Sequence, residues 1–230
     1  MISQHELAAM IDHTLLKAEA TGAAIDRLCD EAARFGFAAV CVNPIWVTRC
    51  VKRLAGTPVC VASVAGFPLG ASRCETKVDE ARRAIEDGAV EVDMVIRVGD
   101  LIDGHVSVVR DDIAAVAEAV HAASKENILK VILETAALTE GQIIAGCRCA
   151  AEAGADFVKT STGFHPSGGA SVEAVQVLRA NARGMKVKAA GGIRTLETAL
   201  AMIRAGADRL GCSSSVQIVQ RVPAREEPSV

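Results

Sequence analysis

The chain has 230 residues, of which 50% are hydrophobic and 3% aromatic, and its formal net charge at pH 7 is −3. A chain of this length can bury a large core without disulfides or metals, and its weak negative charge excludes a general attraction to nucleic acid or to anionic membranes. No apolar stretch reaches the roughly 18 residues of a membrane span, and Met1–Leu16 lack the basic and apolar regions of a signal peptide. Any recognition of phosphate must therefore be local.

One pattern recurs along the chain: a helical stretch, a glycine, and then a short apolar run typical of a strand. The glycines are Gly36, Gly88, Gly154 and Gly206. Each stands where the end of a helix needs a left-handed residue, just before a strand. The runs that follow are too apolar for strands with one face in water, so they predict a parallel sheet that is covered on both faces.

The remaining elements complete this pattern in chain order. Ser3 and Glu6 have capping-box spacing and predict a short leading helix over Gln4–Ala8. The predicted strands are Ala9–Leu15, Ala39–Val42, Val59–Val64, Glu91–Ile96, Ile128–Glu134, Phe157–Thr160, Val187–Ala189 and Arg209–Gly211. The predicted helices lie near residues 22–34, 45–54, 73–86, 106–123, 140–152, 171–181, 196–204 and 214–220.

Strict alternation of strands and helices, without a linker or a change in composition, predicts a single (β/α)8 TIM barrel over residues 1–230. Residues 1–8 form its leading helical segment and residues 221–230 a flexible tail. A doubly wound open sheet is the alternative architecture. It usually has fewer strands and a GxGxxG motif after the first one, and that motif is missing from this sequence.

The chain has eight cysteines and five histidines. The cysteines fall mostly inside predicted strands or helices and form no CxxC pair, so we expect reduced thiols in a cytoplasmic protein. Cys41 ends the second strand at the rim of the expected pocket, and we interpret it as an inert thiol, although a reactive aldehyde could modify it. The histidines share no metal-ligand spacing, so we expect no metal site.

Charged side chains occur late in several predicted strands, where a barrel has its core. They are Asp12, Asp93, Lys130, Glu134, Lys159 and Lys188. Alternate strand residues of a barrel point inward, and the C-terminal strand ends build its active site. Because burying a lone charge is costly, these groups must lose their charge, form pairs or take part in chemistry. For Lys130 and Glu134, a structural ion-pair network or exposure to solvent is as good an interpretation as a catalytic role.

Two lysines, Lys159 and Lys188, are expected to lie near one another. Each cation disfavours protonation of the other, and an apolar wall adds desolvation, so one amine can be neutral near pH 7. A neutral amine attacks a carbonyl to give an iminium, which accepts electrons during cleavage or formation of a carbon–carbon bond. Asp93 could move protons in the same reaction.

Two loops have the composition of a phosphate site. Residues 190–195 (AGGIRT) follow the seventh strand and residues 211–215 (GCSSS) follow the eighth. Loops at these positions commonly bind phosphate in barrels, through backbone N–H groups at a helix N-terminus. Either loop alone could be a tight turn, but the two together favour a phosphate site. The stretch Gly163–Gly169 predicts a mobile loop over the site, and we expect His165 within it to be a loop residue rather than a general acid.

The segments DHTLLKA, VCVNP, VASVAGFPLGA, EVDMVI, LKVILET, GADFVKTSTGF, VKAAGGIRT and GCSSS together resemble the deoxyribose-phosphate aldolase family, in matching order and spacing. The resemblance covers about residues 8–220. It implies reversible cleavage of 2-deoxy-D-ribose 5-phosphate to D-glyceraldehyde 3-phosphate and acetaldehyde. It also implies a covalent Schiff base in place of any metal or cofactor, small phosphorylated sugars and aldehydes as substrates, and a homodimer or higher homo-oligomer.

The resemblance also implies roles for individual residues. Lys159 would form the Schiff base, Lys188 would tune it and take part in proton transfer, and Asp93 would relay protons. The expected substrate-binding residues are Asp12, Thr14 and Thr162, and the expected phosphate-binding residues are Gly163, Gly191, Gly192, Arg194, Gly211, Ser213 and Ser214.

Three positions depart from the family pattern: Arg97 replaces an asparagine, Val90 replaces an alanine, and His165 stands in a loop usually built of small residues. No catalytic residue is lost. Another Schiff-base aldolase or a phosphosugar isomerase on the same barrel is a second interpretation, and an isomerase would need a positioned glutamate base and form no lysine adduct. A phosphosugar-binding protein without catalysis is a third, although Lys159, Lys188 and Asp93 are all present.

Overall fold

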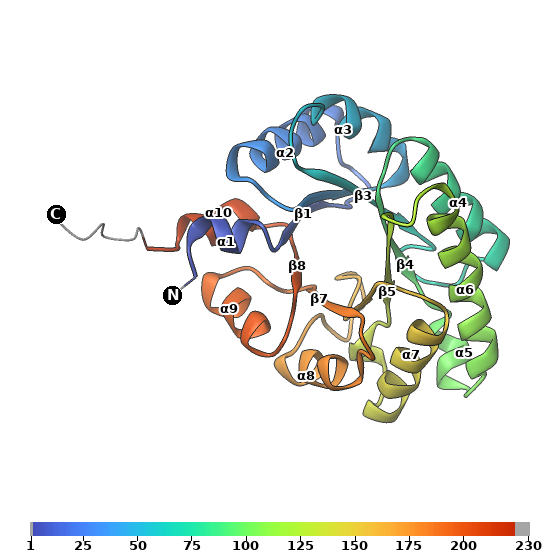
Figure 1. The fold of residues 1–230 in the computed structure, drawn as a ribbon. Coiled ribbons are helices and arrows are strands. Elements are labelled where there is room, and N and C mark those ends of the chain that lie inside the picture. The colour runs from blue at the N-terminus through green and yellow to red at the C-terminus, as the bar shows by residue number, and fades with distance from the viewer. Residues whose placement is uncertain (1, 224–230) are drawn as a thin grey trace.

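The computed structural model describes residues 2–223, and its eight parallel strands form a closed barrel in the order of the chain, with the first strand paired to the eighth (Figure 1). The strands are β1 Ile11–Leu15, β2 Ala39–Val42, β3 Cys60–Ala65, β4 Glu91–Val95, β5 Ile128–Ile132, β6 Phe157–Lys159, β7 Lys186–Ala190 and β8 Arg209–Cys212. The predicted TIM barrel is therefore confirmed, and the open-sheet alternative is wrong.

The helices surround the ring of strands, and α1 lies beside α10 on the outside of the barrel (Figure 1). They are α1 Gln4–Ala8, α2 Gly22–Phe35, α3 Val47–Arg53, α4 Cys74–Glu86, α5 Val98–Ile102, α6 Val106–Ala123, α7 Glu140–Glu152, α8 Val172–Asn181, α9 Leu196–Arg204 and α10 Ser215–Gln220. Two short 3₁₀ helices, η1 Pro44–Trp46 and η2 Thr135–Ala137, follow β2 and β5. The apolar core fills the layer between strands and helices, where Val40, Val92 and Val131 are fully buried.

The four repeated glycines end their helices in the predicted backbone conformation. Gly36, Gly88, Gly154 and Gly206 have φ values of 70°, 102°, 80° and 112°. Gly36 is itself the C-cap of α2, whereas each of the other three follows a right-handed cap residue by one position. A side chain would strain the backbone at these positive φ values, which explains why the repeat places glycine there.

Three local differences from the prediction have physical reasons. The first strand begins at Ile11 because Ala9 still has helical geometry as the C-cap of α1. The predicted helix 45–54 is divided, because Pro44 starts a 3₁₀ turn before α3 begins. Helix α5 has 5 residues, too few to show a helical period in the sequence. Residues 224–230 of the predicted tail lie outside the described residues.

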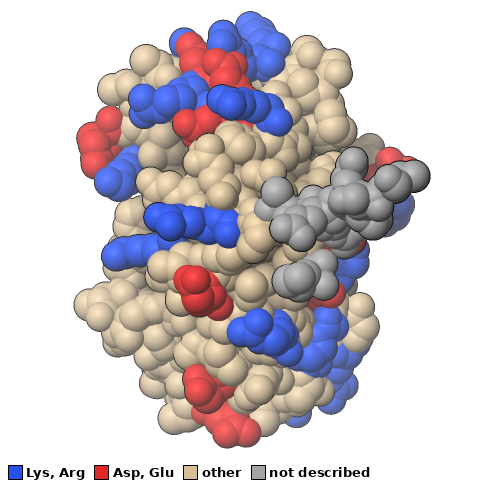
Figure 2. Space-filling model, turned by 90° about the vertical axis from the view of Figure 1, so that its left-hand side faces the viewer, with Lys and Arg blue, Asp and Glu red and all other residues tan. Residues whose placement is uncertain are grey.

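The surface of the barrel carries a mixture of charges. On the face in Figure 2, basic and acidic side chains are both spread over a largely uncharged surface. In the described part of the chain, no helix has the length and apolar character needed to cross a membrane. All eight cysteines lie within residues 2–223, and each of them is a free thiol.

Candidate active site

A cavity of about 310 Å³ opens among the loops that follow β1, β6, β7 and β8, at the C-terminal end of the barrel. Nine of the predicted site residues line it: Thr14, Lys159, Thr162, Gly163, Gly191, Gly192, Arg194, Gly211 and Ser213. Lys17, Leu15 and Leu16 also line it and were not predicted. The other four predicted residues lie outside this lining: Asp12, Asp93 and Lys188 are fully buried, and Ser214 is the N-cap of α10.

Lys159 is the last residue of β6, and only 3% of its surface is exposed. Its Nζ donates a hydrogen bond to Asp93 Oδ2 at 2.7 Å. Burial lowers the pKa of this amine, the Asp93 carboxylate opposes that change, and the nearby Lys188 ammonium adds to it, so the pKa lies below its ordinary value. The geometry therefore presents an amine with reduced proton affinity at the floor of the cavity, which is the property a carbonyl nucleophile needs.

Lys188 lies next to Lys159 in the register of β6 and β7. Its Nζ donates to the same oxygen, Asp93 Oδ2, at 2.7 Å and also to Asp12 Oδ2. Burial opposes the charge on Lys188, but the two carboxylates outweigh it and raise its pKa. The sequence predicted that one of the two lysines would lose its charge. Of the two, Lys159 has the lowered pKa and Lys188 the raised one.

Asp93 joins the two lysines, and its environment keeps it ionised. Burial alone would raise its pKa, but Lys130, Lys159 and Lys188 together lower the pKa well below its ordinary value. For Asp12, the charges of Lys188, Lys130 and Arg209 likewise outweigh burial and lower the pKa. Both carboxylates can therefore accept hydrogen bonds without holding a proton themselves.

The loops after β6 and β7 approach one another closely at the rim of the cavity, and β8 packs closely against β7 beside them. Gly163 and Gly191 have φ values of 83° and 89°, and a Cβ on Gly169 would lie 2.3 Å from the carbonyl oxygen of Gly191. A Cβ on Gly211 would lie 2.9 Å from the Cβ of Ala190 and 3.3 Å from the Cε of Lys188. These glycines let the loops converge, and Gly211 also leaves room for the Lys188 side chain.

Glu134 organises the start of the loop after β6. Its carboxylate is buried and accepts hydrogen bonds from the Thr162 backbone N–H at 3.2 Å and from the Thr162 hydroxyl at 2.5 Å. Its own φ is 61°, an unusual conformation for a glutamate. Lys130, which the sequence pairs with Glu134 on one strand face, lies instead in the barrel interior with Asp93 at 2.9 Å. Of the interpretations open for Lys130, the ion-pair network is confirmed.

The network contains two further residues that the sequence did not single out, Glu91 and Arg209. Glu91 Oε2 lies 2.5 Å from Lys130 Nζ, and Arg209 Nη1 donates to Asp12 Oδ1 at 2.6 Å. A signal for Glu91 was present, because it stands two residues before Asp93 and therefore on the same strand face. Arg209 gave no such signal, because the residue two positions later on its strand face is Gly211, which carries no charge.

Three other residues marked in the sequence lie apart from this chemistry. Cys41 is buried in β2, and burial raises its pKa to about 11, which agrees with an inert thiol. His165 accepts a hydrogen bond from the Ser167 backbone N–H at 3.2 Å within its loop. Arg97 pairs with Asp100 at 2.6 Å on the surface.

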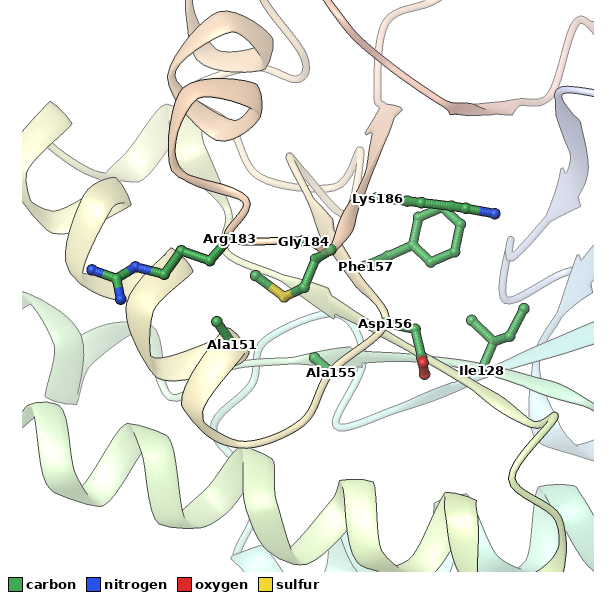
Figure 3. Close-up of a pocket in the computed structure, with 9 residues that line it drawn as sticks. Ile128, Ala151, Ala155, Asp156, Phe157, Arg183, Gly184 and Lys186 are labelled. Atoms are coloured by element: carbon green, nitrogen blue, oxygen red, sulfur yellow. The ribbon is translucent and has the colours of Figure 1, made fainter.

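A second hollow, of about 390 Å³, lies at the opposite end of the barrel, where β5, β6 and β7 begin (Figure 3). Arg183 and Lys186 point in opposite directions there. Asp156 is already engaged with the Leu129 backbone N–H at 2.7 Å and with His121 at 3.0 Å. The polar groups of this second hollow do not converge on a common point, so the cavity at the C-terminal end of the barrel is the better candidate for chemistry.

Among residues 2–223, no group of three or more His, Cys, Asp or Glu side chains could hold a metal ion. Fold and site together define a (β/α)8-barrel protein with a buried amine of reduced basicity at the C-terminal end of its strands. The sequence profile of the DeoC/LacD family of aldolases matches residues 7–221, and the chain belongs to this family.

Individual relatives agree with this assignment. The chain is 52% identical over 218 residues to a deoxyribose-phosphate aldolase of Geobacillus sp., covering 94% of this chain and 96% of the relative. It is 55% identical over 218 residues to that of Thermococcus gammatolerans, with 94% and 96% covered. The solved deoxyribose phosphate aldolase of Aeropyrum pernix, described as a tetramer, is 33% identical with a TM-score of 0.88, covering 95% of this chain and 91% of that one.

Proposed function

We propose that this chain is a class I deoxyribose-phosphate aldolase, which reversibly cleaves 2-deoxy-D-ribose 5-phosphate to D-glyceraldehyde 3-phosphate and acetaldehyde. The observation that carries this proposal is the Lys159 amine, which lines the cavity and has a lowered pKa. Relatives that are about half identical over nearly the full chain support the choice of substrate.

The reaction begins with the neutral Lys159 amine. Its nitrogen lone pair attacks the C1 aldehyde of the open-chain sugar, and loss of water from the carbinolamine gives an iminium. A base removes the proton of the C3 hydroxyl, the C2–C3 bond breaks, and its electron pair flows into the iminium to form an enamine. Glyceraldehyde 3-phosphate leaves, a proton adds to C2, and water releases acetaldehyde from Lys159.

Asp93 and Lys188 are the groups placed to handle these protons. Asp93 Oδ2 lies 2.7 Å from Lys159 Nζ and 2.7 Å from Lys188 Nζ, so it can accept a proton from either nitrogen and return it. The raised pKa of Lys188 keeps its amine protonated, so it is the group that holds a proton next to Asp93 during this exchange. Asp12 is buried beneath it and does not line the cavity, so we place its effect on the substrate through Lys188.

The remaining cavity residues hold the substrate. Thr14 and Thr162 line the cavity together with Lys159. Their hydroxyl groups donate to the Asp12 carbonyl oxygen and to Glu134, so toward the substrate we propose that their oxygens act as acceptors. The phosphate binds at the loops after β6, β7 and β8, where Arg194 supplies positive charge and Ser213 a hydroxyl donor. Gly163, Gly191, Gly192, Gly211 and Ser214 complete the proposed phosphate site. Gly163, Gly191 and Gly192 have positive φ values, and because glycine has no side chain the backbone at these positions can come close to the phosphate.

We further propose that the enzyme works without a metal or cofactor, in the cytoplasm, as a homodimer or higher homo-oligomer. The chemistry above requires only protein groups and water. Free thiols at all eight cysteines suit a reducing compartment. The tetrameric relative from Aeropyrum pernix supports association of several copies.

Trapping of the covalent intermediate tests the proposal. Acetaldehyde followed by borohydride should leave an ethyl group on the peptide that contains Lys159, detected by peptide mass, and chelators should leave turnover unchanged. Lys159→Ala should remove both the adduct and the cleavage activity. Lys186→Ala, which removes an exposed lysine of the neighbouring strand, should retain both. An adduct on another lysine, or turnover without any adduct, would contradict the mechanism.

A further inference from the structure

The ion-pair network continues beneath the cavity toward the opposite end of the barrel. A lower set of charges begins with Lys130, which lies 2.9 Å from Asp93 and 2.5 Å from Glu91. Arg209 closes the set by pairing with Asp12 at 2.6 Å and with Glu91 at 3.4 Å. The charges at the far end are thus connected to Lys159 through Asp93, the carboxylate that it shares with Lys130 and Lys188.

The charges of this network do not balance if every group is ionised. Within residues 2–223 it contains three carboxylates, Asp12, Glu91 and Asp93, and four basic groups, Lys130, Lys159, Lys188 and Arg209. All of them are buried or nearly so, and a surplus charge in such a medium is costly. Loss of one proton from a basic group brings the network to neutrality.

The pairing identifies the basic group that gives up its proton. Lys130, Lys188 and Arg209 each lie between at least two carboxylates. In the described chain, Lys159 forms an ion pair with Asp93 only, and Asp93 is shared with two other lysines. Lys159 is therefore the least stabilised cation. The pKa of Lys130 and that of Arg209 are raised because nearby carboxylates outweigh burial, in agreement with this order.

We propose that Arg209 and Glu91, at the end of the barrel opposite the cavity, are positioning residues whose charges set the pH at which Lys159 becomes a neutral nucleophile. The proposal rests on the proposed function, because it assigns these two residues a role in the reactivity of the Schiff-base lysine. Neither residue lines the cavity, so neither can act by touching the substrate.

The groups that act on Lys159 come from most of the strands around it. Asp93 on β4, Lys188 on β7 and the Cys41 thiol on β2 act on it most strongly. Behind them lie Lys130 on β5, Asp12 on β1, Glu91 on β4 and Arg209 on β8, while Lys17 and Arg194 line the cavity above. Only Glu91 and Arg209 are altered in the test below, so every other charge stays in place.

The two substitutions should have opposite effects. Arg209→Met removes a cation, so the carboxylates hold the Lys159 proton more tightly, and the acid limb of kcat/KM against pH should move up by roughly one pH unit. Glu91→Gln removes an anion at nearly constant size, so the proton is held less tightly, and the same limb should move down by a similar amount. The double variant should return close to the parent profile.

The experiment measures kcat/KM for sugar cleavage and the rate of cyanoborohydride-trapped acetaldehyde adduct on Lys159, both between pH 5 and 10, on the full-length enzyme. Arg209→Lys keeps the charge and should keep the profile. Arg179→Met is the matched control, because Arg179 pairs with Asp208 at the same end of the barrel but is half exposed and outside the network. Its profile should not move.

Opposite movements that cancel in the double variant would support the proposal. A merely structural role predicts lower activity without movement of the limb, and that outcome, or movement of both variants in the same direction, would overturn it. If one single variant fails to fold by circular dichroism, the direction of the other decides the question. Absence of a Lys159 adduct in the parent enzyme at every pH would instead overturn the proposed function.

Discussion

Asp93 holds more of the site together than any other single residue. Its Oδ2 accepts hydrogen bonds from Lys159 and Lys188, and its Oδ1 accepts one from Lys130 at 2.9 Å. An amide at this position could still accept a hydrogen bond, but it would carry no charge and could not serve as a base. Loss of the charge would therefore affect proton transfer and the balance of the whole network together.

Asp93→Asn should lower kcat for sugar cleavage by roughly 10²–10⁴-fold, the range associated with loss of a general acid or base. Steady-state kinetics at pH 7 measures the effect. Asp112→Asn is the matched control, since Asp112 is equally buried and paired with a lysine but lies outside the barrel interior. The control should lose stability and keep its kcat. Equal losses of kcat in the two variants would assign Asp93 to structure alone.

At the scale of elements, α4 and α6 are joined by an ion pair that is entirely buried. Lys77 Nζ lies 2.7 Å from Asp112 Oδ2 and donates to the carbonyl oxygen of Val95 at 2.9 Å, at the end of β4. Replacing only Lys77 or only Asp112 would leave the other as an uncompensated buried charge. Replacing both with apolar residues leaves no buried charge and avoids this cost.

Lys77→Met alone should therefore destabilise the protein by about 3–5 kcal/mol, and so should Asp112→Leu. The double variant Lys77→Met/Asp112→Leu should lie within about 2 kcal/mol of the parent chain. Urea unfolding, followed by the fluorescence of Trp46, measures the free energy of unfolding. Additive losses in the double variant would show that the pair is not the main source of the effect.

The elements that could be predicted from sequence are those with a strong local signal. Gly36 and the three equivalent glycines predicted helix ends, because a positive φ at such a position favours glycine. The apolar runs that follow them predicted the strands. Helix α5 could not be found in this way, because its 5 residues are too short for a period. The division of the helix near Trp46 depends on a single residue, Pro44, which lies just before the predicted helix range.

The site follows the same rule. Lys159, Lys188 and Asp93 could be predicted because charges inside apolar strands require partners. Their pairing depends on the register of β4 to β7, which no local pattern reveals. Arg209 could not be predicted, because its contact with Asp12 joins residues 197 positions apart and exists only in the closed barrel.

At the scale of the whole molecule, stability should depend on pH through the buried carboxylates. Asp12 and Asp93 have lower pKa values in the folded chain than in the unfolded chain, where the value is about 3.9. The unfolded chain therefore binds more protons at acid pH. The stability that these groups contribute is present above about pH 4 and is lost as the pH falls toward their folded pKa values.

The contribution of Asp12 and Asp93 to the free energy of unfolding should accordingly be lost below pH 4, by up to about 1.4 kcal/mol per pH unit for each carboxyl. Urea unfolding at a series of pH values measures this dependence. Asp103→Asn removes an exposed carboxylate outside the buried network and should leave the acid limb unchanged. A free energy of unfolding that stays constant down to pH 3 would contradict the assignment of buried, ionised carboxylates.

Closure of the ring has a consequence for when the enzyme can first work. The hydrogen bond from Lys188 on β7 to Asp12 on β1 joins residues that are 176 positions apart. Strand β8 lies between these two strands in the barrel and is the last strand to be synthesised. A nascent chain that has not yet supplied this strand cannot seal the interior, so water would reach the amines and erase the difference in basicity between them. We therefore expect the Lys159 amine to gain its reactivity toward aldehydes only when β8 is in place. Borohydride trapping on a chain that ends before Arg209 should give no preferential adduct on Lys159, and an adduct equal to that of the full chain would contradict this expectation.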